Sequence, residues 1–399
     1  MSGLDLNRLN SFKDEILKAE IGALLFNLGK THIGFWKEKE GNIYFSVDKN
    51  CFKSTFGFEL FSSYKDYYEN QTGINKTPFE YEIEKHHLDN SIKNTTVNFP
   101  FIVIDWIEFF KGNASQEDFI KKIFFRGCEN INSGIDKGAP NTQLKPPLWL
   151  SNAFGSFKKQ IEEKDFDLRR QTFFQNFYDF LSKNNYLTNP DWTVIRNFVI
   201  SQIKIWYSNL LSDSRFPIND VSLWDQAYMT ASMFKAVLSQ LIMETSLQNI
   251  NTHNYFINPS SIKWRILGVQ YDKLGLAEKG FKLTSIEWYR ERAKEIDNEI
   301  KELLEVEYPI GNEIYRDETG IYFIVGENIG QDGSNDLASL KPDLNDIEKR
   351  IVEIFNRKLE GEVYPAIVLT KASRGLMNLG YLLEEAKKNF LKLKINDDI

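Results

Sequence analysis

Three acidic residues in the last third of the chain stand where carboxylates could hold metal ions. Asp272 follows a predicted strand over residues 263–271, and Asp317 and Glu318 lie in the turn of a predicted hairpin over residues 313–325. Two-metal nucleotidyl transfer requires acidic oxygen donors close to both ions, and a strand end facing a hairpin turn can supply them. Asp and Glu are also ordinary turn residues, so a purely structural interpretation stands beside the catalytic and nucleotide-binding one.

The turn departs from the pattern of active nucleotide cyclases. Their palm domains carry a Gly-Gly-Asp-Asp or Gly-Gly-Asp-Glu turn, whose glycines let a triphosphate approach the backbone. Here the turn reads Arg-Asp-Glu-Thr-Gly over residues 316–320, with bulky side chains where the glycines belong. The turn therefore favours a palm that serves as a scaffold over a catalytic one.

A second candidate site lies at the end of a predicted N-terminal helix, where residues 26–30 read Phe-Asn-Leu-Gly-Lys. In HD-type phosphohydrolases a His-Asp dyad followed by a Gly-Lys turn ends a core helix. Phe26 cannot ligate a metal, and Asn27 offers only a neutral oxygen. The four histidines of the chain stand in no HD motif. The pattern therefore predicts a degenerate HD site that holds no catalytic metal.

The two candidate sites fall in regions of different pattern. Residues 1–258 read mainly as helices, with two apolar helices over residues 193–211 and 224–244 at their centre. After residue 258 the order becomes strand, helix, strand, strand, helix, strand. The strands are expected over 263–271, 313–316, 321–325 and 363–370, the helices over 286–304 and 344–359, and a final helix over 374–391. We predict an α+β protein with a mainly helical, degenerate HD-like domain (residues 1–258) followed by a ferredoxin-like (βαββαβ) palm domain (residues 259–399).

Composition narrows the class of protein. A length of 399 residues predicts two or three domains, and 42% hydrophobic residues can form substantial cores. The net charge of −7 excludes a uniformly basic nucleic-acid coat, so any contact with nucleic acid must come from a local patch. The two cysteines, the polar N-terminus and the lack of any run of about 20 apolar residues predict a cytoplasmic protein without a membrane segment.

Several blocks of the sequence together resemble one protein family. They are AEIGALLFNLGKTHIGF, RGCENINSGIDKGAP, PLWLSNAFG, VSLWDQAYMTASMFKA, and KWRILGVQYDKLGL through YPIGNEIYRDETGIYF. In this order they resemble the large subunit of type III CRISPR effector complexes, in a divergent branch. Such subunits typically run from an HD-like domain and a first palm to a linker domain, a second palm and a helical domain. The chain is similar to the N-terminal half only, the HD-like domain with the first palm.

The departures from this family concern both active centres. Phe26 and Asn27 stand where the His-Asp dyad belongs, and Gln226 follows Asp225 where related sequences carry a further metal-binding His. These losses imply that the single-stranded DNase activity is gone. The second palm of the family bears the Gly-Gly-Asp-Asp turn that makes cyclic oligoadenylates from ATP, and that turn occurs nowhere in this sequence. The resemblance implies a different role for the three palm carboxylates. They would line a composite pocket for ATP and Mg²⁺ that is formed together with a partner palm.

The resemblance implies a non-nucleolytic, scaffold-like large subunit, or half of a split one, in a type III CRISPR ribonucleoprotein for antiviral defence. Its expected partners are the CRISPR effector backbone subunits, the crRNA and the target RNA, with a second palm on a separate polypeptide. Two alternatives stay open. One is a nucleotidyl cyclase or cyclic oligoadenylate synthase that works through the palm with a partner palm. The other is a free-standing regulator that binds nucleotides through the palm.

Overall fold

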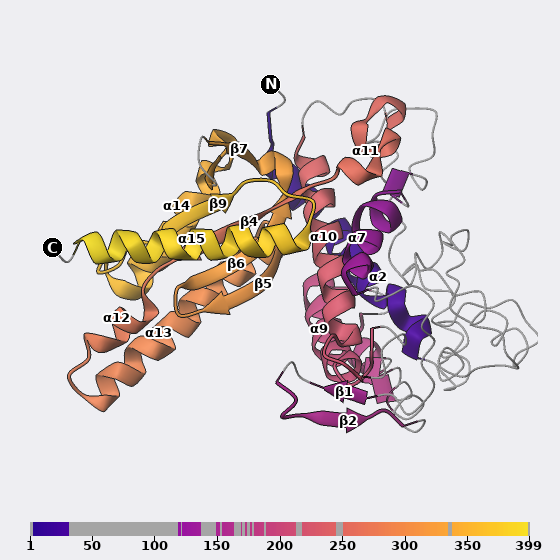
Figure 1. Cartoon of the computed structure of the whole chain (residues 1–399), viewed down its shortest axis with the longest axis horizontal. Coiled ribbons are helices and arrows are strands. Elements are labelled where there is room, and N and C mark those ends of the chain that lie inside the picture. Colours follow the sequence, from indigo (N-terminus) through magenta and orange to yellow (C-terminus); the bar gives the residue numbers. More distant parts are fainter. Residues whose placement is uncertain are drawn as a thin grey trace, which may run out of the picture. The chain divides into compact units, whose positions relative to one another are not determined.

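The computed structural model describes most of the C-terminal half of the chain and several stretches of the N-terminal half (Figure 1). The described residues are 3–31, 119–120, 122–136, 149–151, 154–162, single residues and short stretches between 169 and 186, 189–212, 218–244, 250–333 and 337–397. They combine helices with two sheets, which confirms the prediction of a mixed α+β structure at that level.

Contacts divide the chain into two compact units. One, the sheet unit, comprises Met1–Ile16, Trp106–Ile131 and Ser232–Ile399; the other, the helical unit, comprises Leu17–Asp105 and Asn132–Ala231. The sequence pattern placed a boundary at residue 258, whereas residues 232–258 belong with the sheet. One reason is a buried contact, in which the indole N–H of Trp264 donates to the carbonyl of Met233 at 2.9 Å.

The sheet unit is built on a six-stranded sheet with the order β5-β6-β4-β9-β8-β7, in which all neighbours pair antiparallel. The strands are β4 (Trp264–Gln270), β5 (Gly311–Asp317), β6 (Gly320–Gly326), β7 (Gly330–Asp332), β8 (Leu337–Leu340) and β9 (Ala366–Thr370). The helices are α1 (Leu6–Ser11), α11 (Asn254–Ile257), α12 (Lys273–Glu278), α13 (Leu283–Glu302), α14 (Asn345–Leu359) and α15 (Leu376–Asp397). Each of the four expected strands and three expected helices is present, with ends that differ by a few residues. The β7–β8 hairpin and α12 were not expected.

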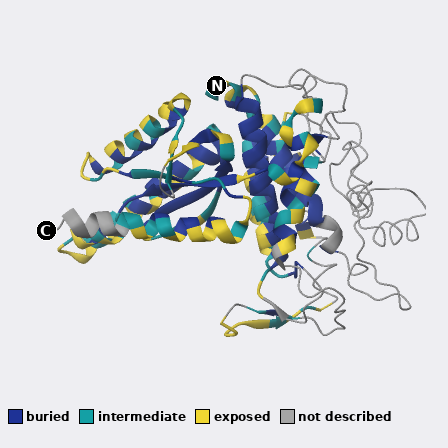
Figure 2. Cartoon of the chain, turned by 45° about the horizontal axis from the view of Figure 1, so that its top comes forward, coloured by how far each residue is buried: buried dark blue, intermediate teal, exposed yellow. Residues whose placement is uncertain are grey.

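Helices cover both faces of the two central strands, because every residue of β4 and β6 is buried. On one face the Tyr271 ring packs edge-on against Phe355 of α14, with ring centroids 4.8 Å apart, and its hydroxyl oxygen lies 3.0 Å from the Ala293 carbonyl oxygen of α13. On the other face the Gln270 side chain donates to the Ala386 carbonyl of α15 at 3.3 Å. Adjacent residues of an extended chain point to opposite faces, so α13 and α14 lie on one side of the sheet and α15 on the other (Figures 1 and 2).

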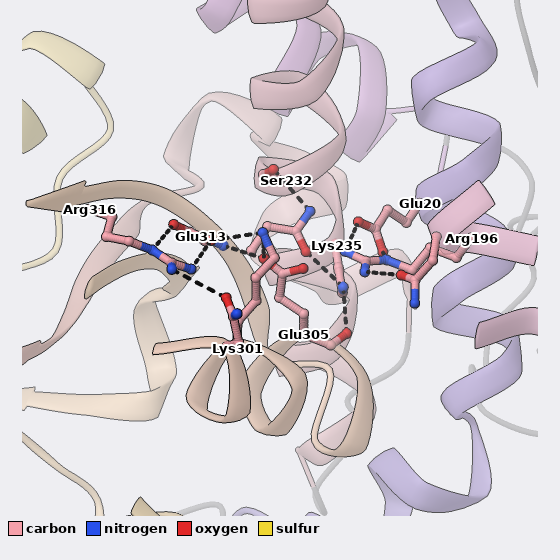
Figure 3. Close-up of polar contacts among 11 residues, drawn as sticks. Glu20, Arg196, Ser232, Lys235, Lys301, Glu305, Glu313 and Arg316 are labelled. Carbon is pink, nitrogen blue, oxygen red and sulfur yellow. Dashed lines mark hydrogen bonds and ion pairs between the residues drawn. The ribbon is translucent and has the colours of Figure 1, made fainter. Parts of the chain in front are cut away.

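A buried lysine ties α10 (Leu223–Met243) to the start of β5 (Figure 3). Lys235 is fully buried, and its ammonium group donates to the Glu305 carbonyl and to Asn312 Oδ1, each at 2.8 Å. The Asn312 amide donates in turn to Ser232 Oγ at 3.0 Å. Glu305 lies in the π-helical turn Leu303–Glu307 that follows α13, and its carboxylate accepts from the Glu313 N–H at 2.8 Å. A buried charge is tolerated only with such hydrogen bonds, so this network holds β5 in place.

The helical unit is centred on a buried ion pair. Its elements include α9 (Trp192–Tyr207), a 3₁₀ turn (Phe26–Thr31) and a small sheet of β1 (Trp149–Ser151), β2 (Lys158–Gln160) and β3 (Ile218–Asn219). Three helices contribute residues to both units: α2 (Lys13–Leu25), α7 (Asn130–Asp136) and α10. Arg196 of α9 donates to both carboxylate oxygens of Glu20 of α2 at 2.7 Å (Figure 3). Both side chains are buried, so removing either partner would leave an uncompensated charge.

Gly268 of β4 is closely packed between side chains of the two neighbouring strands. A Cβ atom there would lie 2.8 Å from the Tyr322 ring and 2.9 Å from a Val368 methyl group. We expect Gly268→Ala to lower the free energy of unfolding by about 1–3 kcal/mol, the usual effect of overpacking a core. Chemical or thermal unfolding followed by circular dichroism measures the change.

The matched control is Gly380→Ala in α15, where an added Cβ meets no atom within 4 Å. Because Ala is the better helix former, this change should leave the stability equal or raise it by about 1 kcal/mol or less. A Gly268→Ala protein as stable as the Gly380→Ala protein would contradict this account of the sheet packing.

Candidate functional site

The structure brings the β5–β6 turn beside the end of β4. Gln270 pairs with Gly320, and the backbone N–H groups of Tyr271 and Lys273 donate to the carbonyls of Thr319 (3.1 Å) and Glu318 (3.2 Å). Gly320 is required by this approach, because a Cβ atom there would lie 2.4 Å from the Val269 carbonyl oxygen. The two acidic segments singled out in the sequence are therefore neighbours in space.

Their carboxylates nevertheless serve separate purposes. Asp272 is the N-cap of α12, where its Oδ1 accepts from the Gly275 N–H at 2.9 Å. Asp317 Oδ1 accepts from the Thr319 N–H at 2.9 Å and from its hydroxyl at 2.6 Å. Glu318 is exposed. Among the residues that the structure describes, no three His, Cys, Asp or Glu side chains form a cluster that could hold a metal ion.

Lysine ammonium groups, rather than clustered carboxylates, lie at this turn. The Lys273 ammonium donates to Asp297 Oδ2 at 2.7 Å and to the carbonyls of Asp317 (2.8 Å) and Gly320 (3.1 Å). Asp297 is a buried residue of α13, and its other oxygen accepts from the Tyr271 hydroxyl at 2.8 Å. Burial lowers the pKa of Lys273, and the charge of Asp297 opposes part of that shift. Lys273 thus ties the turn backbone to α13.

A second lysine neutralises the turn carboxylate. Lys387 of α15 lies 2.7 Å from Asp317 Oδ2, and its ammonium group is 4.8 Å from the centre of the Tyr315 ring. Burial raises the pKa of Asp317, but hydrogen bonds from Lys387 and Thr319 outweigh it, so the pKa is lowered. For Lys387, burial lowers the pKa and the hydrogen bond to Asp317 more than reverses this, so the pKa is raised. Both groups are therefore held in their charged forms.

In the second candidate site, Phe26 and Asn27 are both buried, in the 3₁₀ turn that follows α2. Phe26 contributes to the apolar core. The Asn27 side chain is only 1% exposed, and among the described residues neither its oxygen nor its nitrogen has a hydrogen-bond partner. An unpaired buried amide destabilises a fold, so Asn27 is the most costly polar group at this helix end.

Asp225 and Gln226 lie at the start of α10, where their polar groups serve the helix. Asp225 Oδ2 accepts from the Ser222 N–H at 2.8 Å and from its hydroxyl at 2.7 Å, while the Asp225 N–H donates to Ser222 Oγ at 3.4 Å. This reciprocal arrangement is a capping box. Gln226 is buried, and its carbonyl accepts from the Asn132 amide at 2.8 Å, which also donates to Thr230 Oγ1 at 2.9 Å.

Sequence reasoning missed the residues that dominate the turn. Lys273 directly follows Asp272, so its position was visible, but its partner Asp297 was only one of many acidic residues of α13. Lys387 lies in a helix that closes the fold, and its approach to Asp317 depends on how that helix crosses the sheet.

No model of a known protein family matches the sequence, and no curated protein matches it either. None of the helices in the described part of the chain has both the length and the apolar character needed to cross a membrane. The function must be inferred from the residues and their geometry.

The Lys387–Asp317 pair should stabilise the protein in a pH-dependent way. We expect Lys387→Met to lower the free energy of unfolding at neutral pH by about 1–3 kcal/mol, as for a hydrogen bond between charged groups. Since the folded pKa of Asp317 is lowered, its contribution is complete above the ordinary value near 4 and is lost as the pH falls through the folded pKa. Since the folded pKa of Lys387 is raised, its contribution is lost only as the pH rises through that higher pKa.

Thermal unfolding of the wild type and Lys387→Met across a pH series measures this. The difference in free energy of unfolding between the two proteins should be constant from about pH 5 to 9 and should become smaller below about pH 4. The control is Lys349→Met, which removes an exposed ion pair with Asp346 at 3.1 Å and should cost less than about 0.5 kcal/mol. A Lys387→Met difference that stays unchanged at acidic pH would contradict the assignment.

The two buried asparagines of the helical unit should respond oppositely to leucine. Asn27→Leu removes an unpaired amide, so we expect the free energy of unfolding to rise by about 1 kcal/mol. Asn132→Leu breaks two hydrogen bonds and should lower it by about 1–3 kcal/mol. Unfolding curves of the two variants give the comparison. Equal destabilisation by both changes would show that the Asn27 amide has a polar partner after all.

Proposed function

We propose that this chain is a non-nucleolytic, scaffold-like large subunit, or half of a split one, of a type III CRISPR RNA-guided effector complex. The sequence blocks similar to such subunits support the proposal, as does the strand order. The segment β5-β6-β4-β9, with helices after its first and third strands along the chain, has the order of a ferredoxin-like βαββαβ fold. On this basis residues 259–399 are a palm domain, and the helices around Phe26 and Asn27 are a degenerate HD-like domain.

The main support for a scaffold role is that the Asp317 carboxylate of the β5–β6 turn is paired with a lysine. Metal-dependent nucleotidyl transfer needs carboxylates whose oxygens are free to face two cations. Here Asp317 Oδ2 is 2.7 Å from Lys387, and Lys273 donates to the turn carbonyls. A metal ion would have to displace an ammonium group that is already paired. The residues present therefore do not by themselves fit an Mg²⁺–ATP site.

The helical unit supports the same conclusion. A nuclease of the HD type needs histidine and aspartate side chains directed at metal ions. Phe26 is part of the core, and Asp225 accepts hydrogen bonds from the residue that begins its own helix. The structural contacts of Phe26 and Asp225 therefore support a non-nucleolytic role.

In this proposal the subunit acts in antiviral defence in the cytoplasm, docked on the subunit that holds the crRNA 5′ end and facing the target RNA. ATP and Mg²⁺ would enter only in a composite pocket with a second palm on a separate polypeptide. A nucleotidyl cyclase that uses Asp272, Asp317 and Glu318 with that partner palm is the alternative, and the pairing of Asp317 with Lys387 argues against it.

Affinity purification from native cells tests the proposal. A tagged chain should co-purify CRISPR backbone subunits, identified by mass spectrometry, and crRNA, identified by sequencing. An unrelated tagged protein of similar charge from the same cells is the control. A preparation that contains neither crRNA nor backbone subunits would refute membership in the complex.

The purified assembly also separates the scaffold from the cyclase. With target RNA, ATP and Mg²⁺ or Mn²⁺, Asp317→Ala and Asp225→Ala assemblies should yield the same nucleotide products as the wild type. If the products vanish in Asp317→Ala and survive in Asp225→Ala, the palm of this chain is catalytic and the scaffold proposal fails.

A further inference from the structure

Strands β1 and β2 of the helical unit are joined in a hairpin (Figure 1). Aromatic and basic side chains of this hairpin are exposed. Phe154 is 93% exposed and Phe157 is 49% exposed. They stand on either side of Gly155, whose φ of +68° is the backbone conformation that a tight turn asks of glycine. Lys158 follows directly in β2. We call Trp149, Phe154, Phe157 and Lys158 the hairpin surface.

The register of the hairpin places part of this surface on its outer face. Leu150 is buried and pairs with Lys159, so Trp149 and Lys158, one residue away on each strand, lie on the opposite face. There the Lys158 ammonium is 4.4 Å from the centre of the Trp149 ring, a cation–π contact. Lys159 is anchored differently, since its ammonium group donates to Asn209 Oδ1 at 3.5 Å.

The local charge is opposite to that of the whole chain. Residues 149–161 contain two lysines and no Asp or Glu, and the next carboxylate along the chain is Glu162. Within the described part of the structure, no carboxylate pairs with Lys158. In a protein of net charge −7, Lys158 therefore supplies a local positive charge that an anionic partner can approach.

The apolar side chains of the hairpin surface are aromatic. Aromatic rings favour an anionic partner that has flat groups able to stack on them. The two phenylalanines are exposed, so in the chain alone their rings contribute little to the core. Flat rings beside lysines are the combination with which proteins hold single-stranded nucleic acid, because unpaired bases stack on the rings and phosphates lie near the ammonium groups. Paired bases of a duplex are already stacked on one another and offer no free faces.

We propose that the hairpin surface binds single-stranded nucleic acid, with Phe154 and Phe157 stacking on bases and Lys158 beside a phosphate. The proposal rests on the proposed function in one respect, since it names the ligand class that the helical unit contacts in an RNA-guided assembly. Its physical basis is the hairpin alone.

Fluorescence anisotropy of the purified full chain with labelled oligouridine RNA and oligothymidine DNA tests it. Phe154→Ala/Phe157→Ala should weaken binding about tenfold or more, since each stacked base contributes substantially to affinity. Lys158→Gln should weaken binding and make the slope of log affinity against log salt shallower by about 0.7, the value for one lost phosphate contact on a single strand.

The control is Phe281→Ala/Lys282→Gln in the sheet unit, where a phenylalanine that is 102% exposed also precedes a lysine. This variant should bind as the wild type does. All altered side chains are exposed, and circular dichroism checks that each variant is folded. An equal loss in the control and hairpin variants would overturn the proposal, because binding would then depend on exposed Phe–Lys pairs in general.

Three further outcomes would also overturn it: no binding of either oligonucleotide by the wild type, a preference for duplex, or binding to phosphatidylserine-containing vesicles without binding to the oligonucleotides. The last would identify the hairpin as a membrane contact. Hairpin-dependent binding in a protein that co-purifies no crRNA would remove the proposed function and leave this inference intact. If the protein co-purifies crRNA but the Phe154→Ala/Phe157→Ala variant binds as well as the wild type, the proposed function stands and this inference fails.

Discussion

The pairing of β4 with β6 is the constraint on which the rest of the sheet unit depends. The two strands pair along their full lengths, and every residue of both is buried, so helices must cover both faces. Closure of one face by α13 brings Asp297 to Lys273, and closure of the other by α15 brings Lys387 to Asp317. The requirement to bury the central strands therefore also determines which charges meet at the β5–β6 turn.

This arrangement has a direct consequence for chemistry. A carboxylate serves a metal ion only while its oxygens are available, and an ammonium group is a point charge that satisfies a carboxylate without offering any coordination site. In the helical unit the acidic groups are likewise committed, because Asp225 caps α10 and Glu20 holds the buried Arg196. In both units, acidic and basic side chains of the kinds that an enzyme directs at its substrate are paired with other residues of the chain.

The exposed parts of the molecule show a different use of side chains. The hairpin around Gly155 presents two phenylalanine rings and Lys158 to solvent. A protein whose described acidic residues are paired internally, and whose surface carries exposed aromatic groups, is suited to hold a partner in place. The proposed assembly role and the proposed nucleic-acid contact both follow from this difference: interior polar groups are paired with one another, and exposed groups are available to a partner.

The sequence by itself determined the order of strands and helices after residue 258, because period-two and helical patterns are local and were read within a few residues of their observed ends. It also indicated that Asp272 would lie near the turn of Asp317, since strand order follows from that pattern. Only the tertiary structure decided that Asp272 caps α12, that Lys387 pairs with Asp317, and that residues 232–258 join the sheet. These outcomes depend on which distant side chains meet when helices close over both faces of a buried sheet, and local patterns contain no information about that closure.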